Sequence, residues 1–299
     1  MKQLLLPAAA LLLSVQVATA QIKLPQASPS ATVTQTVGTT DITVTYSRPS
    51  ARGRAIFGSL IPYGQLWRTG ANMATKLTTS TDLTVEGQTL PAGSYAIFSI
   101  PEQSEWTLIF NKNTNQGGTA DYKQDQDALR VKIKAQPAGD KLETFTISFG
   151  DLTDSTATLN LMWADVKAVA NVAVDASANA AANVDKAVAD KPNDPAVLQA
   201  AAGYNLSKGR NLDQSLDWVN KAIGAKETFR NLFLKAQLLG KLGRYAEAVP
   251  VAQRALQLGE SSNDPAFPFF KDAIQKSITD YSALLPKPAN MLKGKKKKA

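Results

Sequence analysis

The feature that most constrains the fold is a change in hydrophobic periodicity near residue 175. Before it, from about residue 31, polar and apolar side chains alternate in short segments rich in Val, Ile, Thr and aromatic residues. This alternation is typical of strands with one buried face. After it, alanine becomes frequent and apolar residues recur at the spacing of a helix. The chain is therefore predicted to be an α+β multidomain protein, with a β-rich domain followed by a helical domain.

The β-rich domain, at residues 21–174, is predicted to be an antiparallel β-sandwich or barrel. Turn-forming residues separate its short strands, for example at 85–88 and at 137–140. Several short strands with such turns between them favour this fold class, although they do not determine a strand order. The clearest strands are expected at 41–46, 82–85, 106–110, 129–133, 145–149 and 157–162.

The helical part is predicted to begin with a helical linker at residues 175–194. Its alanine-rich helix should end before Lys191-Pro192, because proline cannot continue a helix from within. Residues 195–286 are predicted to form helical hairpins. An amphipathic segment at 263–285 would supply the terminal helix that covers the last hairpin.

Two of the expected hairpins match each other at an offset of 33 residues, which pairs 212–216 with 245–249. This period and the segment 243–248, Gly-Arg-Tyr-Ala-Glu-Ala, resemble the tetratricopeptide repeat. The resemblance implies a stack of hairpins whose concave face holds a peptide or protein partner. The first copy departs from the pattern at Ser215, and both copies lack the closing proline. An ordinary helical bundle is the alternative.

The first twenty residues predict a signal peptide. Lys2 precedes an apolar run at 4–13, and Ala18-Thr19-Ala20 has the small-residue pattern of a cleavage site. We expect cleavage before Gln21 and export to the periplasm or the extracellular space. Since no later apolar segment is long enough to span a bilayer, a membrane-spanning protein is not expected.

The sequence contains no cysteine and no histidine. Disulfides, thiolate nucleophiles, zinc sites with Cys or His ligands and Ser-His mechanisms are therefore excluded. The nucleophile-elbow and phosphate-binding-loop motifs are also missing from the sequence. We therefore expect no enzymatic activity, no metal site and no cofactor. A chain without cysteine also suits an oxidising compartment outside the cytoplasm.

The formal net charge of +8 comes largely from the C-terminal tail. Residues 287–299 carry six lysines and no acidic residue, while the preceding sequence is close to neutral. Nucleic-acid binding by the folded part is therefore not expected, because such proteins carry a basic face on a domain. The tail is predicted to be disordered, and at low salt to contact anionic envelope polymer weakly.

Three short sequence blocks occur in order within the β-rich domain: Arg48-Pro49, Gly-Arg-Ala-Ile-Phe-Gly at 53–58 and Trp-Arg-Thr-Gly-Ala-Asn at 67–72. Their succession resembles the exported bacterial domain-of-unknown-function family 2911 over residues 28–174. The resemblance implies an exported β-rich domain, and it supplies neither an activity nor catalytic residues. The family tends to carry an acidic residue where this chain has Met73 and Ala74.

The long non-repetitive stretch at 48–72 contains the candidate ligand-binding residues. A loop of this length in a compact domain is usually functional or packed over the fold. Arginine suits carboxylate or phosphate, and aromatic rings stack on sugars. In the alternative interpretation, the arginines brace the loop against backbone carbonyls. The candidate residues are Arg48, Arg52, Arg54, Tyr63, Trp67, Arg68 and Asn72.

Two hypotheses for the function follow. The first is a non-enzymatic exported scaffold that binds a protein or peptide partner in the cell envelope through its helical repeats. The second is a small-ligand or glycan-binding protein, or a glycan-active one, that uses an arginine-rich pocket. The first predicts an apolar groove within 195–259, whereas the second predicts that Arg48, Arg54, Arg68 and Asn72 surround a cavity.

Overall fold

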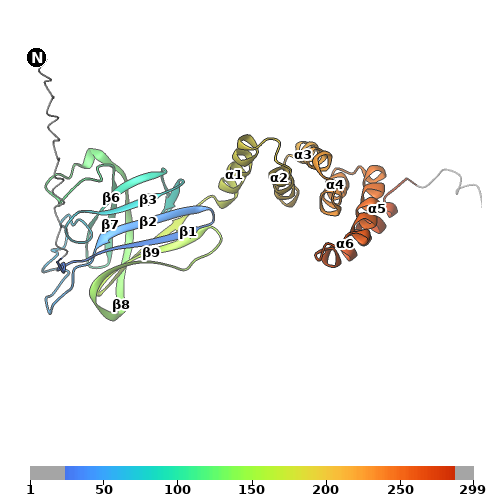
Figure 1. Ribbon diagram of the computed structural model, residues 1–299. Helices are drawn as coiled ribbons and strands as arrows, with labels where there is room; N and C mark the ends of the chain where they lie inside the picture. The colour runs from blue at the N-terminus through green and yellow to red at the C-terminus, as the bar shows by residue number, and fades with distance from the viewer. Residues whose placement is uncertain (1–23, 287–299) are drawn as a thin grey trace, which may run out of the picture. The chain divides into compact units, whose positions relative to one another are not determined.

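The structure is a computed structural model, and it describes residues 24–286 (Figure 1). The chain forms two compact units, and the boundary between them in the sequence lies between Val174 and Asp175. The first contains the strands and the second contains the helices. The predicted signal peptide at 1–20 and the lysine-rich tail at 287–299 lie outside the described residues.

The first unit is one antiparallel sheet, which has nine strands within residues 24–286. A 3₁₀ turn, η1 (Gln124–Gln126), precedes the eighth strand. The order across the sheet is β1-β2-β3-β6-β7-β8-β9-β4-β5. The strands are β1 (Ser30–Val37), β2 (Thr40–Ser47), β3 (Thr75–Thr79), β4 (Leu83–Val85), β5 (Gln88–Leu90), β6 (Gly93–Ile100), β7 (Glu105–Asn111), β8 (Asp127–Gly150) and β9 (Thr156–Ala173).

The sheet is open, so the barrel alternative of the sequence prediction is wrong. Within the described residues, β1 pairs only with β2 and β5 pairs only with β4, which leaves two edges. The short β4–β5 hairpin has three residues in each strand. Such short strands offer few backbone hydrogen bonds for pairing with β1, so they do not close the sheet into a barrel.

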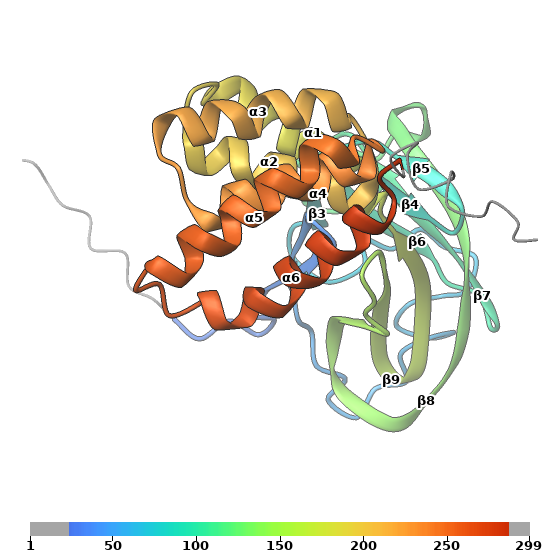
Figure 2. The ribbon, with the colours of Figure 1, turned by 90° about the vertical axis from the view of Figure 1, so that its right-hand side faces the viewer.

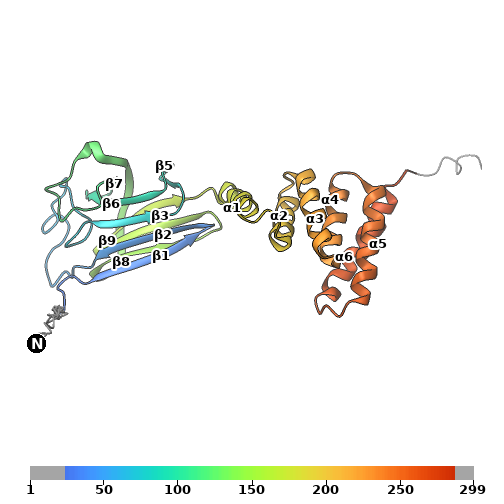
Figure 3. The ribbon, with the colours of Figure 1, turned by 45° about the horizontal axis from the view of Figure 1, so that its top comes forward.

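The open sheet bends so that its first strands face β8 and β9 (Figure 3). The ring of Tyr46 on β2 lies 5.8 Å from that of Phe145 on β8. The backbone N–H of Ile147 donates to the Tyr46 hydroxyl at 3.0 Å. The interior between these strands is filled by side chains from both ends of the sheet.

Aromatic residues from distant parts of the sequence form the centre of this interior. Trp67, which precedes β3, stacks on Trp163 of β9 with ring centroids 6.0 Å apart. The ring centroids of Phe57 and of Trp106 on β7 lie 4.9 Å apart. Trp106 and Trp163 are almost completely buried. The irregular stretch at 48–72 therefore supplies part of the core, through Phe57 and Trp67.

The turn predicted at 137–140 is instead a bulge within the long strand β8. Pro137 pairs with Val166, and the next paired residue is Leu142, opposite Ala164. The extra residues include Gly139, which has a φ of 82°. Turn-forming residues placed against a continuous partner strand can thus produce a bulge and keep the hairpin intact.

The second unit consists of helices, six of them within residues 175–286 (Figure 2). Consecutive helices pack on each other, and α2 also contacts α4, as α4 contacts α6. The alanine-rich helix predicted within 175–194 and the amphipathic helix predicted at 263–285 are confirmed as α1 and α6. The helices are α1 (Ala176–Asp190), α2 (Pro195–Lys208), α3 (Leu212–Ala225), α4 (Phe229–Lys241), α5 (Tyr245–Ser261) and α6 (Phe267–Ala283).

The matched sequence segments occupy matched places in these helices. Helices α3 and α5 begin at Leu212 and Tyr245, the first residues of the two matched segments. Their matched small residues, Ser215 and Ala248, are both fully buried. The small residues therefore lie where helices approach each other. Among the described residues, no helix has the length and apolar character needed to cross a bilayer.

Candidate functional site

Two of the candidate arginines are hydrogen-bonded to nearby parts of the β unit. Arg48 donates from Nε to the carbonyl of Phe145 at 3.1 Å and from Nη2 to Thr146 Oγ1 at 2.7 Å. Arg54 donates from Nε to the carbonyl of Ala51 at 2.9 Å and from Nη2 to that of Ser50 at 2.7 Å. These contacts are the bracing arrangement that the sequence left open as an alternative.

Arg52 and Arg68 have different surroundings. Arg52 is exposed and has a φ of 52°, and its backbone N–H donates to Glu143 Oε1 at 2.7 Å. Arg68 is half-buried, and its buried Nε has no hydrogen-bond partner within residues 24–286. Neither guanidinium lines the β-unit pocket described below.

The aromatic candidates also lie apart from each other. Trp67 is 5% exposed, and its indole N–H donates to the carbonyl of Gly70 at 3.0 Å. Its role is therefore in the core. Tyr63 is exposed, and its ring covers Gly58, where an added Cβ would lie 2.7 Å from the ring. The structure does not bring the seven candidates together around one cavity.

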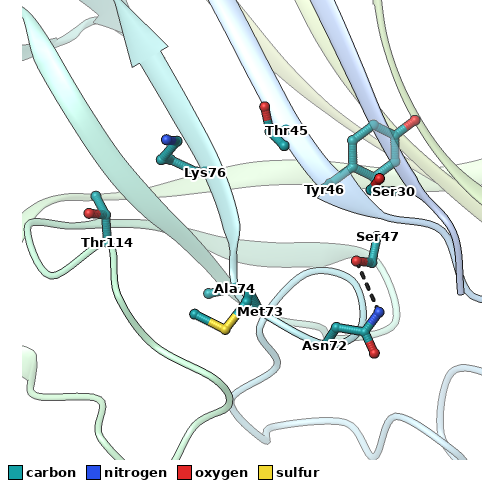
Figure 4. Close-up of a pocket in the computed structure, with 9 residues that line it drawn as sticks. All are labelled: Ser30, Thr45, Tyr46, Ser47, Asn72, Met73, Ala74, Lys76 and Thr114. Carbon is teal, nitrogen blue, oxygen red and sulfur yellow. Dashed lines mark hydrogen bonds between the residues drawn. The ribbon is translucent and has the colours of Figure 1, made fainter. Parts of the chain in front are cut away.

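Asn72 is the candidate that lines a pocket in the β unit (Figure 4). Its Nδ2 donates to Ser47 Oγ and to the carbonyl of Ser28, both at 3.2 Å. We call this cavity of about 340 Å³ the β-face pocket. It is lined by Ser30, Thr45, Tyr46, Ser47, Asn72, Met73, Ala74, Lys76 and Thr114.

The helical unit has two adjoining cavities on α2, α4 and α6, of about 380 and 370 Å³. They share Gln237 of α4, and together we call them the helix groove. The larger cavity is lined by Ala196, Gln199, Ala200, Gly203, Arg230, Phe233, Leu234, Gln237 and Phe270. The smaller is lined by Leu206, Gln237, Gly240, Lys241 and Tyr281.

Equivalent positions of α2 and α4 line the helix groove. Each lining residue of α2 has a counterpart in α4 that also lines it, 34 residues later in the sequence. The groove is therefore the shared face of two related helices, continued by α6. The pairs are Ala196 with Arg230, Gln199 with Phe233, Ala200 with Leu234, Gly203 with Gln237 and Leu206 with Gly240.

The charged groups of the helix groove are basic. Arg230 pairs with Asp264 at 2.9 Å, and Lys241 is exposed in the last turn of α4. Within the described part of the chain, no Asp or Glu lines either cavity. Burial raises the pKa of Tyr281, and the nearby carboxylate of Asp280 raises it further. The Tyr281 hydroxyl therefore remains a neutral donor and acceptor near neutral pH.

Sequence reasoning missed most of the residues in these cavities. Gln199, Gly203 and Gln237 belong to no chemical motif, yet the 34-residue offset between α2 and α4 would have marked their common face. For Lys76 and Thr45 the sequence has no such signal, because alternating strands carry many exposed polar residues.

A comparison with known protein families finds a match within the β unit. Residues 28–172 match a family model described as "Protein of unknown function (DUF2911)". Searches of curated proteins and of solved structures find no significant match. The match runs from just before β1 almost to the end of β9 and excludes the helical unit. The β-rich unit is thus the part of the chain that matches the family which its sequence blocks resemble.

Proposed function

We propose that this protein is a non-enzymatic binding module that holds a segment of a partner protein in the helix groove. The observation that carries the proposal is the groove itself, in which equivalent faces of α2 and α4 continue onto α6. A continuous face that extends over three helices suits a peptide chain better than a compact small molecule.

The helical hairpins act in this proposal as tetratricopeptide-like repeats. Support comes from the buried small residues at matched positions, Ser215 with Ala248 and Ala222 with Ala255. Further support comes from Gly209 and Gly243, which follow α2 and α4 with φ values of 65° and 75°. Similar helix ends and similar close contacts are what repeated hairpins require.

The chemistry of the groove favours an acidic peptide with apolar side chains. Phe233 and Phe270 offer apolar surface, and the amides of Gln199 and Gln237 offer hydrogen bonds to a peptide backbone. Lys241 has no ion pair within residues 24–286. Its ammonium would attract a carboxylate of the partner.

The partner belongs, in this proposal, to the cell envelope. The predicted signal peptide at 1–20 supports export to the periplasm or the extracellular space. The lysine-rich tail at 287–299 would add weak, salt-sensitive contacts with anionic envelope polymer.

The test fills the helix groove without disturbing the helix that bears it. An added Cβ at Gly203 meets no atom within 4 Å, so the side chain of Gly203→Leu can enter the helix groove without a clash at Cβ. Leucine also has a higher helix propensity than glycine, so α2 should remain folded. Gly224→Leu is the matched control, because Gly224 also has open space and lines neither cavity of the groove.

A displayed library of random peptides would be selected on the full chain, and the enriched peptides titrated by fluorescence anisotropy. We expect enrichment of peptides that combine Asp or Glu with aromatic or aliphatic residues. Gly203→Leu should weaken their binding about tenfold or more, whereas Gly224→Leu should not. An absence of enrichment, or equal binding to the Gly203→Leu variant, would refute the proposal.

A further inference from the structure

We infer that the β-face pocket is a second binding site, and that it takes a small polyhydroxylated anion such as a sugar acid or a sugar phosphate. The pocket lies between the first three strands of the sheet and the segment 72–74, with Thr114 at its margin (Figure 4). This inference does not depend on the helix groove, which belongs to the other unit.

The lining of the pocket is rich in groups that both donate and accept hydrogen bonds. Five of its residues carry such hydroxyls, and that of Tyr46 is already bonded to the backbone of Ile147. The other four are Ser30, Thr45, Ser47 and Thr114. Asn72 adds an acceptor, its Oδ1, at the same wall, because its two amide N–H groups already donate to Ser47 Oγ and to the carbonyl of Ser28. The hydroxyls of a sugar also both donate and accept hydrogen bonds, so each can pair with a polar group of the pocket.

The charge of the pocket points to an anionic form of such a ligand. Lys76 on β3 lines it, is exposed, and forms no ion pair with any residue that the structure describes. No carboxylate is among the described residues that line the pocket. An ammonium without a counter-ion beside several hydroxyls favours a carboxylate or a phosphate bound through charge-assisted hydrogen bonds.

The size of the pocket agrees with a ligand of this class. Its volume of about 340 Å³ is at the lower end of the range for small-molecule sites, roughly 300–1,000 Å³. The apolar side chains of Met73 and Ala74 provide a surface for the faces of a sugar ring. A monosaccharide with one anionic group therefore fits better than a long glycan or a peptide.

The wall that carries Asn72 is held in one conformation. Asn72 and Thr69 have φ values of 57° and 53°, and this region is strained for a β-branched residue such as Thr69. The fully buried Thr69 hydroxyl lies 2.9 Å from Ser99 Oγ. The N–H of Ala74 donates to the carbonyl of Gln116 at 2.9 Å. These bonds pre-organise the pocket, so little ordering is needed on binding.

The test measures ligand binding to the full chain by isothermal titration calorimetry. The probes are glucuronate and glucose 6-phosphate, with glucose and inorganic phosphate as the neutral and non-sugar controls. We expect at least one sugar anion to bind about tenfold more tightly than either control. The comparison of carboxylate with phosphate identifies which anionic group the site prefers.

Two variants connect this binding to the pocket. Lys76→Met removes the charge at an exposed position and should weaken binding of the sugar anion about tenfold or more. Lys134→Met is the matched control, since Lys134 is an exposed lysine of β8 outside the pocket, and binding should not change. Failure of both sugar anions to bind, equal binding of glucose, or unchanged binding by the Lys76→Met variant would overturn the inference.

Discussion

Adding a single methyl group, in the variant Gly259→Ala, should test how α6 packs on the rest of the helical unit. A Cβ added at Gly259 of α5 would lie 2.0 Å from Cε2 and 2.1 Å from Cδ2 of Phe267. Phe267 is 8% exposed and belongs to a cluster in which its ring lies 5.3 Å from that of Phe229. The absence of a side chain at Gly259 therefore makes room for this ring.

The expected magnitude follows from two opposing effects. In Gly259→Ala the ring must retreat by about 1.5 Å to reach ordinary carbon–carbon contact of about 3.5 Å, and crowding of this kind costs about 1–3 kcal/mol. Alanine is favoured over glycine inside a helix by about 1 kcal/mol. Since Phe267 is packed on several sides, we expect the crowding to prevail and the free energy of unfolding to fall by about 2 kcal/mol.

Urea unfolding followed by circular dichroism at 222 nm measures this effect, because the helices dominate that signal. A loss of about 2 kcal/mol should lower the midpoint by about 1 M urea. The control is Gly224→Ala, where the added Cβ meets open space and stability should rise by up to about 1 kcal/mol. If Gly259→Ala is as stable as Gly224→Ala, the proposed close approach of α5 and Phe267 is wrong.

Two further predictions concern the β unit. Arg48→Met should lower its melting temperature, because it removes two hydrogen bonds to β8 at a half-buried position, at a cost of about 1–3 kcal/mol. Arg52→Met, at an exposed position, should change stability by less than about 0.5 kcal/mol, and equal losses in the two variants would contradict the bracing role of Arg48. Burial, together with the hydrogen bond to Asp127, raises the pKa of Tyr122 to about 12. Because the neutral phenol is favoured in the folded state, the resulting stabilisation is present below pH 10 and lost as the pH rises towards 12. Titration of absorbance at 295 nm should show a tyrosine with a midpoint near pH 12 that disappears in Tyr122→Phe, and an unchanged titration would refute the shift.

The bracing of the arginines shows where residue type alone is ambiguous. Arg48 and Arg54 have the guanidinium fork that binds anions in many proteins, and the sequence places them in a suitable long loop. Three of their four hydrogen bonds go to backbone carbonyls, and the fourth goes to the hydroxyl of Thr146. Phe145 and Thr146, the partners of Arg48, lie far along the sequence. Whether an arginine has a free or an occupied fork depends on such distant groups.

Local structure was largely predictable because its causes lie within a few residues. Glu86-Gly87 forms the turn between β4 and β5, with positive φ at both positions, as a tight hairpin requires. Helix α1 begins at the capping residue Asp175, whose carboxylate accepts from the N–H of Ala178 at 2.8 Å. Turn chemistry, helix capping and periodicity act over short distances, so the sequence displays them directly.

The sequence by itself determined the change from strands to helices, the positions of several strands and helices, and the matched helical segments. Only the tertiary structure decided that the sheet is open, that the turn residues at 137–140 form a bulge, and which side chains border the two cavities. The physical reason is the distance along the sequence over which each effect acts. Periodicity and capping are properties of neighbouring residues, whereas a cavity wall combines side chains such as Ser30, Lys76 and Thr114 that only strand pairing and loop packing bring together.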